Sequence, residues 1–315
     1  MLTGNDKKYM KRALELAALA RGNTSPNPLV GAVIVHNDRI IGEGFHTKAG
    51  EAHAEIVAID SVRDKYLLKE ACIYVTLEPC SHYGRTPPCV ERIINEKIPR
   101  VVIGTVDTSS KVNGRGIKIL REAGISVRTG ELEKESRELN KRFFTYHEKK
   151  RPYIILKWAR TADGFIDRIR LDNKKGPNWI TGVEERMLVH KWRSEEDAIL
   201  VGDTTACNDD PALDVRLWTG KNPRRFALSE SAELPHGLKI FKGEPPAVIF
   251  TFNERPAGTK ATYIALKNRE KVLEELMDYM YREEIQSLLI EGGNIVLSQF
   301  IEARLWDEAR IFTGD

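Results

Sequence analysis

The sequence feature that most limits the possible folds is a set of metal-ligating side chains between positions 53 and 89. The segment carries His53-Ala54-Glu55, then Cys80, then Cys89. One imidazole and two thiolates can hold a tetrahedral zinc ion by three positions and leave the fourth for water, as in a catalytic site. Glu55 is not needed as a ligand and is free to move protons at that water. A fold that carries this sequence must bring three separate segments to one point.

The spacing of the two cysteines departs from the general pattern of nucleobase deaminases, in which H-x-E is followed by P-C-x-x-C. Here eight residues separate Cys80 from Cys89. Pro87-Pro88 favours a helix that carries Cys89 in its first turn, where the helix dipole stabilises the thiolate. We therefore expect His53 and Cys89 at two helix starts and Cys80 in the loop after a strand.

Two plainer interpretations stay open at this point. A single histidine is more often a surface or core residue than a ligand, and cysteines are often small hydrophobic residues. A structural zinc would need a fourth protein ligand, for which His82 is available. The catalytic interpretation is favoured because the four residues occur together.

Composition excludes several classes of protein. The chain has 315 residues, 41% hydrophobic and 30% charged, which suits a globular protein of two domains. Its net charge of +3 is nearly balanced, so nothing indicates a nucleic-acid binder. No long apolar run or secretory signal is present, and we expect a cytoplasmic protein. The remaining cysteines, Cys72 and Cys207, are expected to be structural.

Hydrophobic periodicity predicts alternating strands and helices in both halves, which indicates α/β domains. In the first half the predicted elements are a helix over 6–21, a hairpin over 29–45, helices over 53–64 and 87–95, strands over 72–76 and 100–104, and a charged helix over 131–142. In the second half they are strands over 153–159, 198–201, 247–252, 287–290 and 308–312, with helices near 183–195, 269–283 and 295–301. The charge run within Thr145 to Pro152 predicts the boundary between the domains.

One further motif lies in the second half. The apolar strand ending at Ile290 is followed by Glu291-Gly292-Gly293-Asn294 and a helical pattern. Bare amides at such a helix start suit a phosphate, although Gly-Gly turns are also common without one. No G-x-G-x-x-G follows a strand, which argues against a Rossmann fold.

These residues together give the chain its resemblance to the RibD family, bifunctional riboflavin-biosynthesis enzymes that join a pyrimidine deaminase to a reductase. The matching runs of the first half are Pro26 to Gly31, Gly42 to His46, His53 to Glu55, and Val75 to Cys89, whose eight-residue cysteine spacing is that of the family. Those of the second half are Leu156-Lys157, Asp163-Gly164, Trp179 to Thr181, Arg193, Asp197 to Leu200, Asp209 to Leu213, Val215-Arg216 and Glu291 to Gly293.

The resemblance implies a fold, a pair of activities and two cofactors. Residues 1–147 are expected to form a cytidine-deaminase-like, three-layer α/β/α domain that contains zinc. Residues 148–315 are expected to form a dihydrofolate-reductase-like domain that uses NADPH. The implied reactions are hydrolytic deamination of a diaminopyrimidine ribosyl phosphate and reduction of its ribosyl group to ribityl. The implied partners are this small substrate and other copies of the chain, with no nucleic acid and no membrane.

The resemblance also assigns roles to individual residues. It implies zinc held by His53, Cys80 and Cys89, with Glu55 as the catalytic side chain of the deaminase. In the reductase we interpret Lys157 and Glu291 as the catalytic polar pair nearest the reacting carbon. Substrate contacts are expected from Asn27, His46, His82, Arg85, Arg193, Leu213, Arg216 and Glu291. Cofactor contacts are expected from Ala159, Trp179, Thr205, Asp209, Ser229, Gly293 and Asn294.

Two departures from the family concern the second half. Gly176-Pro177-Asn178 stands where the family commonly has a serine before the Trp-Ile-Thr run, so Asn178 is expected to replace a hydroxyl contact. The sequence stops at Asp315, where family members continue with further strands, and an exposed sheet edge is expected there. The alternatives left open are a deaminase with an inactive reductase half, a nucleic-acid base deaminase, and a deaminase fold with a structural zinc.

Overall fold

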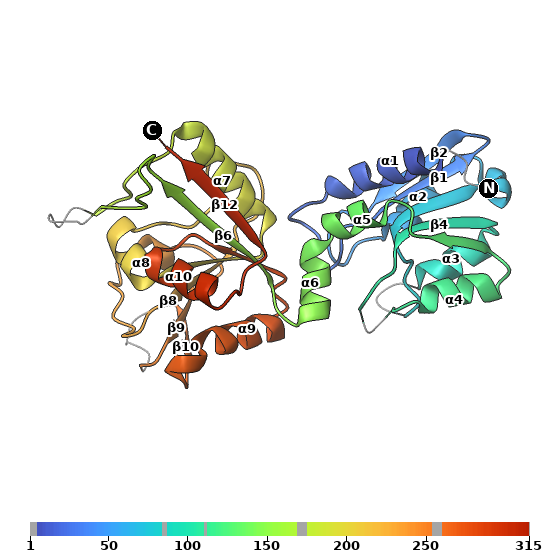
Figure 1. Cartoon of the computed structure of the whole chain (residues 1–315). Coiled ribbons are helices and arrows are strands. Elements are labelled where there is room, and N and C mark those ends of the chain that lie inside the picture. Colours follow the sequence, from blue (N-terminus) through green and yellow to red (C-terminus); the bar gives the residue numbers. More distant parts are fainter. Residues whose placement is uncertain (1–4, 84–86, 110–111, 169–174, 254–259, 315) are drawn as a thin grey trace. The chain divides into compact units, whose positions relative to one another are not determined.

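The computed structural model describes residues 5–83, 87–109, 112–168, 175–253 and 260–314. The chain forms two compact units, Met1–Lys149 and Lys150–Asp315. Figure 1 draws the first in blue to green and the second in green to red. Each unit has its own sheet and its own core, and each is described separately below.

The first unit is built on a five-stranded sheet in the order β2-β1-β3-β4-β5. Its strands are β1 (Gly31–His36), β2 (Arg39–Phe45), β3 (Cys72–Leu77), β4 (Arg100–Thr105) and β5 (Ser126–Thr129). The hairpin partner β2 and β3 both run antiparallel to β1, whereas β3, β4 and β5 are parallel. The parallel strands end at the same edge of the sheet, and this edge carries the loop to Cys80.

Helices cover both faces of this sheet, which gives the expected three layers (Figure 1). One face carries α2 (Ala54–Ser61), α3 (Cys89–Asn95) and α4 (Arg115–Glu122), whose Ala58, Ile93 and Leu120 are fully buried. The other carries α1 (Asp6–Ala18), which buries Met10 and Ala13, and α5 (Glu133–Leu139). A 3-10 helix spans Lys65–Glu70.

The helix predicted over 131–142 is two helices, because Asn140 interrupts it. The Asn140 side chain accepts a hydrogen bond from the Leu29 N–H (2.8 Å) and donates one to its carbonyl (2.9 Å). The chain then continues as α6 (Lys141–Lys149), in which Phe143 and Phe144 are buried. The segment predicted as a boundary from Thr145 is therefore helical as far as Lys149. Buried aromatic residues outweigh the charge run in deciding this local structure.

The second unit contains a seven-stranded sheet in the order β10-β9-β8-β7-β11-β6-β12, with every pair parallel. Its strands are β6 (Tyr153–Arg160), β7 (Ala198–Gly202), β8 (Arg224–Leu228), β9 (Val248–Thr251), β10 (Thr262–Ala265), β11 (Ser287–Ile290) and β12 (Glu308–Thr313). β12 lies at one edge, and its residues are alternately exposed.

Two strands and one helix of this unit are missing from the sequence-based prediction. β8 escapes the hydrophobic pattern because it begins with Arg224-Arg225. The Arg225 side chain is only 4% exposed, and its guanidinium donates to the carbonyls of Gly243 (2.7 Å) and Pro245 (2.6 Å). β10 is only four residues long, and α8 (Asp203–Asp209) is short and polar.

Helices cover both faces of the second sheet as well. One face packs against α9 (Val272–Arg282) and α10 (Asn294–Glu302), through Leu276, Met280 and Phe300. The other packs against α8 and against Trp192 of α7 (Val183–Glu195). Short 3-10 helices span Lys239–Phe241 and Arg269–Lys271. Among the described residues, no helix combines the length and the apolar character needed to cross a membrane.

Candidate active sites

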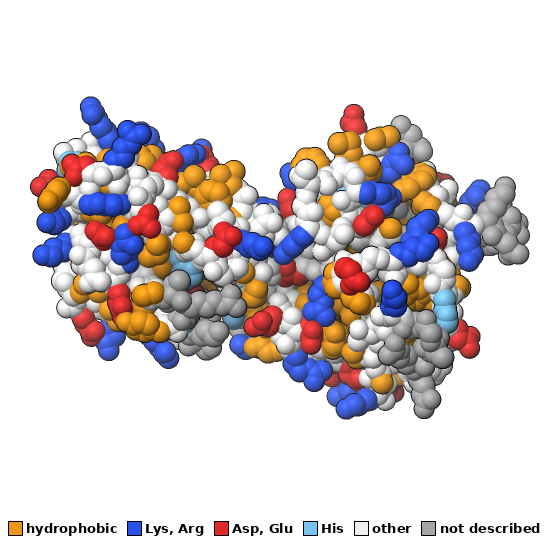
Figure 2. All heavy atoms as spheres, turned by 180° about the vertical axis from the view of Figure 1, so that it is seen from behind, with side chains coloured by type: hydrophobic (Ala, Val, Ile, Leu, Met, Phe, Trp, Pro, Cys, Tyr) orange, Lys and Arg blue, Asp and Glu red, His pale blue; other side chains and the backbone are white. Residues whose placement is uncertain are grey.

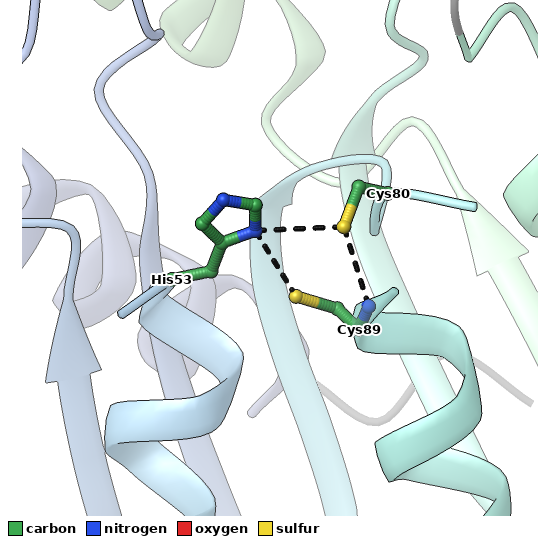
Figure 3. A group of neighbouring side chains, drawn as sticks. All are labelled: His53, Cys80 and Cys89. Atoms are coloured by element: carbon green, nitrogen blue, oxygen red, sulfur yellow. Dashed lines mark hydrogen bonds between the residues drawn. The ribbon is translucent and has the colours of Figure 1, made fainter. Parts of the chain in front are cut away.

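The three predicted metal ligands come together in the first unit (Figure 3). His53 is the N-cap of α2, Cys89 is the first residue of α3 behind the N-cap Pro88, and Cys80 lies in the loop after β3. Their ligating atoms all lie within 4.8 Å of one another. Proline before Cys89 places it in the first helical turn, as the sequence predicts.

Hydrogen bonds within this cluster favour the thiolate form of Cys80. The His53 Nδ1 lies 3.2 Å from the Cys89 Sγ and 3.5 Å from the Cys80 Sγ, and the Cys89 N–H donates to the Cys80 Sγ (3.2 Å). The hydrogen bond with Cys89 lowers the pKa of the Cys80 thiol to about 4, and the same contact raises the pKa of Cys89. Two sulfur ligands and one imidazole nitrogen at these distances fit a tetrahedral zinc.

Glu55 lies beside this cluster in the first turn of α2 and is 3% exposed. Burial, followed by the charge of Cys80, raises the pKa of its carboxyl to about 7. A carboxyl with this pKa can take up and release a proton near neutral pH, which suits a general acid and base.

The residues predicted to contact substrate in this unit occupy different surroundings. The Asn27 Nδ2 lies 3.1 Å from the His46 Nε2, and the His46 Nδ1 lies 3.0 Å from the Ala52 carbonyl. The His46 ring meets the His53 ring edge-on at 5.5 Å, and burial lowers the pKa of His46. His46 is therefore expected to be neutral and fixed beside the metal ligand. His82 is exposed in the loop after Cys80, and Arg85 lies outside the described residues.

The second unit has a cavity of about 940 Å³ at the carboxyl ends of its parallel strands. Predicted residues that line it are Lys157, Ala159, Thr205, Asp209, Glu291, Gly293 and Asn294. Asn178, expected to replace a serine contact, lines it too. The position agrees with the general placement of ligands in open α/β sheets, and the size suits a cofactor together with a substrate.

Glu291 is the centre of charge in this cavity. Arg193 donates to both of its carboxylate oxygens (2.7 and 2.8 Å), and the Lys157 Nζ lies 3.6 Å from its Oε2. Burial of Glu291 opposes ionisation, but the attraction of Arg193 and Lys157 outweighs it and lowers the pKa of Glu291 to about 2. The glutamate is thus a fixed anion, and it holds the Lys157 ammonium at the cavity wall.

The Gly292-Gly293 turn brings backbone close to the cavity. A Cβ on Gly292 would lie 2.9 Å from the Gly202 nitrogen and 2.9 Å from the Val201 Cα, and one on Gly293 would lie 2.9 Å from the Thr205 Oγ1. The Gly293 N–H donates to this Thr205 oxygen (2.8 Å). The turn leads directly into α10, so a helix N-terminus faces the cavity, as a phosphate-bearing cofactor requires.

Five other predicted residues of this unit do not line the cavity in the described structure. Trp179 is 56% exposed with Arg186 over its ring at 4.6 Å. Leu213 is buried, Ser229 is buried with an unpaired hydroxyl, and Arg216 pairs with Asp214 (2.5 Å). Arg193 reaches the cavity only through Glu291. The contacts predicted for these residues stay predictions.

Several cavity residues were not found from the sequence. Phe165 lines the cavity and is 65% exposed. It directly follows Asp163-Gly164, and this motif was the sequence feature that could have pointed to it. Asn208 and Glu230 line the cavity from α8 and from just after β8, two elements that the pattern missed, and Arg269 lines it from the start of the helix predicted near 269–283.

Comparisons with known proteins agree with this division. Residues 3–105 match the family model described as "Cytidine and deoxycytidylate deaminase zinc-binding region". Residues 152–314 match the model described as "RibD C-terminal domain". Each match covers one of the two candidate sites.

Relatives of similar length cover both halves. The chain is 42% identical to the riboflavin biosynthesis protein RibD of Aquifex aeolicus, over 99% of this chain and 87% of that protein. It is 35% identical to RibD of Escherichia coli, over 98% and 87%. A solved structure of a diaminohydroxyphosphoribosylaminopyrimidine deaminase/5-amino-6-(5-phosphoribosylamino)uracil reductase from Thermotoga maritima is 41% identical, with a TM-score of 0.86 over 95% of this chain and 84% of that one. Acinetobacter baumannii RibD has the same TM-score at 33% identity, over 98% and 86%.

Proposed function

The chain belongs to the RibD family of bifunctional riboflavin-biosynthesis enzymes, and from this premise we propose how its residues carry out the two reactions. It is a deaminase and a reductase that uses zinc and NADPH. We assign the deaminase to residues 1–147 and the reductase to residues 148–315. The substrate is a diaminopyrimidine ribosyl phosphate, the class of compound named for the Thermotoga maritima protein.

The observation that carries the proposal is the cluster of His53, Cys80 and Cys89 beside the buried carboxyl of Glu55. Zinc held by these three ligands supplies a Lewis acid that makes water nucleophilic at neutral pH. Glu55 would move the two protons of the attacking water in turn, the first to the pyrimidine ring nitrogen and the second to the amino group as its bond to carbon breaks and ammonia leaves. Its pKa of about 7 allows both directions of transfer.

The remaining residues of the deaminase site hold the substrate. Asn27 and His46 are already joined by their side chains, and His46 lies against the ligand His53. We assign them to the pyrimidine and its sugar, together with His82 and Arg85 on the loop between the cysteines. A pyrimidine bound by His46 would lie close to the metal ligands, because the His46 and His53 rings are 5.5 Å apart.

In the reductase, Lys157 and Glu291 lie next to the reacting carbon. NADPH supplies the hydride, and the protein supplies orientation. When bound, NADPH would supply this hydride to the anomeric carbon of the ribosyl group, while the bond from that carbon to the ring oxygen breaks. Lys157 donates a proton to that oxygen, and Glu291 holds the lysine in place through their 3.6 Å contact. The product is the ribityl chain.

The other predicted residues of the second unit divide between cofactor and substrate. We assign cofactor contacts to Ala159, Trp179, Thr205, Asp209, Ser229, Gly293 and Asn294. Arg193, Leu213 and Arg216 are assigned to the substrate, and Arg216 suits its phosphate because a planar guanidinium group forms paired hydrogen bonds. Arg193 also orients Glu291.

The test is an assay on the purified chain with the diaminopyrimidine ribosyl phosphate, NADPH and a determination of bound zinc. We expect about one zinc per chain, ammonia release first, and NADPH oxidation after it. Cytidine in RNA or DNA serves as the competing substrate. Zinc-loaded protein that deaminates only the nucleic acid would contradict the proposal, and ammonia without NADPH oxidation would limit it to the first unit.

We further propose that the enzyme acts in the cytoplasm as a homo-oligomer without nucleic acid. The nearly balanced charge supports the last point. The edge strand β12, with Ile311 46% exposed, supports self-association. Mass measurement in solution tests the oligomer, and fractionation of cells tests the location.

A further inference from the structure

Glu78 is a buried carboxylate that the proposed mechanism does not use. It lies in the loop after β3, two residues before the ligand Cys80, and is 4% exposed. Among the described residues, no lysine or arginine forms an ion pair with it. A buried charge without a counter-ion is costly unless several hydrogen bonds satisfy it. The partners of Glu78 therefore indicate what it holds in place.

Those partners are four backbone N–H groups from two segments. The Oε2 accepts from Asp107 (3.3 Å) and Gly114 (3.0 Å), and the Oε1 accepts from Gly116 (2.9 Å) and Ile117 (3.3 Å). Gly114 is the N-cap of α4, and the other two lie in its first turn. N–H groups at a helix start have no partner within the helix. One carboxylate thus joins the end of β3 to the loop after β4 and to α4.

The backbone of α4 also touches the peptide before Cys80. A Cβ on Gly116 would lie 2.3 Å from the Pro79 carbonyl oxygen, so only glycine permits this approach. On its other side, the Cys80 carbonyl accepts from the Val90 N–H of α3 (3.3 Å). Figure 1 shows α3 and α4 on the same side of the sheet. The loop that carries the Cys80 thiol is therefore held between two helix starts.

We propose that Glu78 is a positioning residue of the metal centre: its carboxylate fixes the Cys80 thiolate where it can hold zinc with His53 and Cys89. This inference rests on the proposed function of those three residues. Groups that orient metal ligands typically change metal affinity by about 10- to 100-fold when they are removed. Without the carboxylate, the turn from Glu78 to Cys80 is free to move, and zinc leaves faster.

The test compares zinc release from the full chain and its Glu78→Gln variant. Glutamine has nearly the same size as glutamate. Its NH₂ group replaces one carboxylate oxygen, however, and cannot accept the hydrogen bonds of the two backbone N–H groups that this oxygen accepted. We expect zinc release to a coloured chelator to accelerate about 10- to 100-fold. NADPH oxidation with the deaminated substrate is expected to stay at the wild-type rate.

Asp6→Asn is the matched control. Asp6 is another buried carboxylate of the first unit and accepts hydrogen bonds from Tyr74 of β3 (2.7 Å) and from Arg100, the first residue of β4 (2.8 Å). This variant is expected to lower the melting temperature and to leave zinc release unchanged. It separates loss of general stability from loss of ligand position.

Gly116→Ala keeps the inference testable if Glu78→Gln does not fold, because it displaces the Pro79 peptide and keeps the carboxylate. Faster zinc release in Glu78→Gln, or in Gly116→Ala where Glu78→Gln does not fold, but not in Asp6→Asn, supports the inference. Release at the wild-type rate, or equal acceleration in Asp6→Asn, overturns it. A wild-type chain that binds no zinc would contradict the proposed function itself and this inference with it.

Discussion

The two sites differ in how the chain assembles them. The deaminase site takes its ligands and its acid from positions 53 to 89, where three local elements meet at one sheet edge. The reductase cavity takes Lys157 from β6, Thr205 from α8 and Glu291 from directly after β11, positions that together span more than a hundred residues. Local assembly leaves a motif in the sequence, whereas distributed assembly leaves scattered single residues.

The two sites also hold charge in different ways. In the deaminase, burial raises the pKa of the catalytic carboxyl of Glu55 to about 7, close to neutral pH. The reductase buries a carboxylate beside two cations, which lowers the pKa of Glu291 to about 2. Glu55 is therefore suited to transferring protons and Glu291 to holding a cation. If this contrast is correct, substitutions at the two glutamates have different consequences.

The largest effect is expected from Glu55→Gln. The amide cannot accept the proton of water, so the rate of ammonia release falls by about 10²- to 10⁴-fold. Bound zinc and NADPH oxidation with the deaminated substrate stay unchanged. Glu70→Gln, at a carboxylate 79% exposed on the same unit, is the control and leaves the rate as it is. Retained turnover in Glu55→Gln would show that Glu55 does not carry the proton transfers.

The next largest effect is expected from Lys157→Met in the other unit. Removal of the ammonium takes away the proton donor, so NADPH oxidation slows by about 10²-fold. Ammonia release continues at the wild-type rate. Lys271→Met removes an ammonium that is 60% exposed and pairs with Glu274, and it serves as the control. An unchanged hydride transfer rate in Lys157→Met would remove this lysine from the mechanism.

Acid is expected to unfold the second unit through Glu291. Its pKa lies near 4.5 in the unfolded chain and at about 2 in the folded one. The depressed pKa stabilises the fold fully above pH 4.5, and this contribution of roughly 3 kcal/mol is lost as the pH falls through about 2.

Tryptophan fluorescence measures this effect selectively, because all five tryptophans lie in the second unit. Urea unfolding between pH 6 and pH 2 should show the loss in the wild type. In Glu291→Gln, stability is lower at neutral pH because Arg193 is left unpaired, and the decline below pH 4.5 is smaller. If the free energy of unfolding declined equally with falling pH in both proteins, Glu291 would not be the group responsible for the loss.

The smallest effect is expected from Gly292→Ala. Its Cβ would meet backbone atoms of Val201 and Gly202 at 2.9 Å, so β7 and β11 must separate slightly. The cost is about 1–3 kcal/mol, measured as a lower urea midpoint by tryptophan fluorescence. Gly237→Ala, where a Cβ meets no atom within 4 Å, is the control. A stable Gly292→Ala variant would mean that this turn tolerates side chains.

Sequence reasoning recovered the fold class and the zinc cluster because each depends on local patterns. His53 and Cys89 start helices, and their neighbours follow helical periodicity. It missed β8, whose Arg225 is buried by carbonyls far along the chain, and it misjudged α6, which is held by buried Phe143 and Phe144. Glu78 was overlooked for the same reason: its four backbone partners lie 29 to 39 residues away. Tertiary contacts of this kind leave no periodic signal.

The central claim is that separate sets of residues carry the deaminase and the reductase reactions. Its most direct test measures ammonia release and NADPH oxidation in one vessel, for the wild type, Glu55→Gln and Lys157→Met. Each variant is supplied first with the diaminopyrimidine substrate and then with its deaminated product. We predict both reactions in the wild type, ammonia alone in Lys157→Met, and in Glu55→Gln only the oxidation of NADPH by the deaminated product. If either substitution abolishes both reactions when each has its own substrate, the assignment of the two sites is wrong.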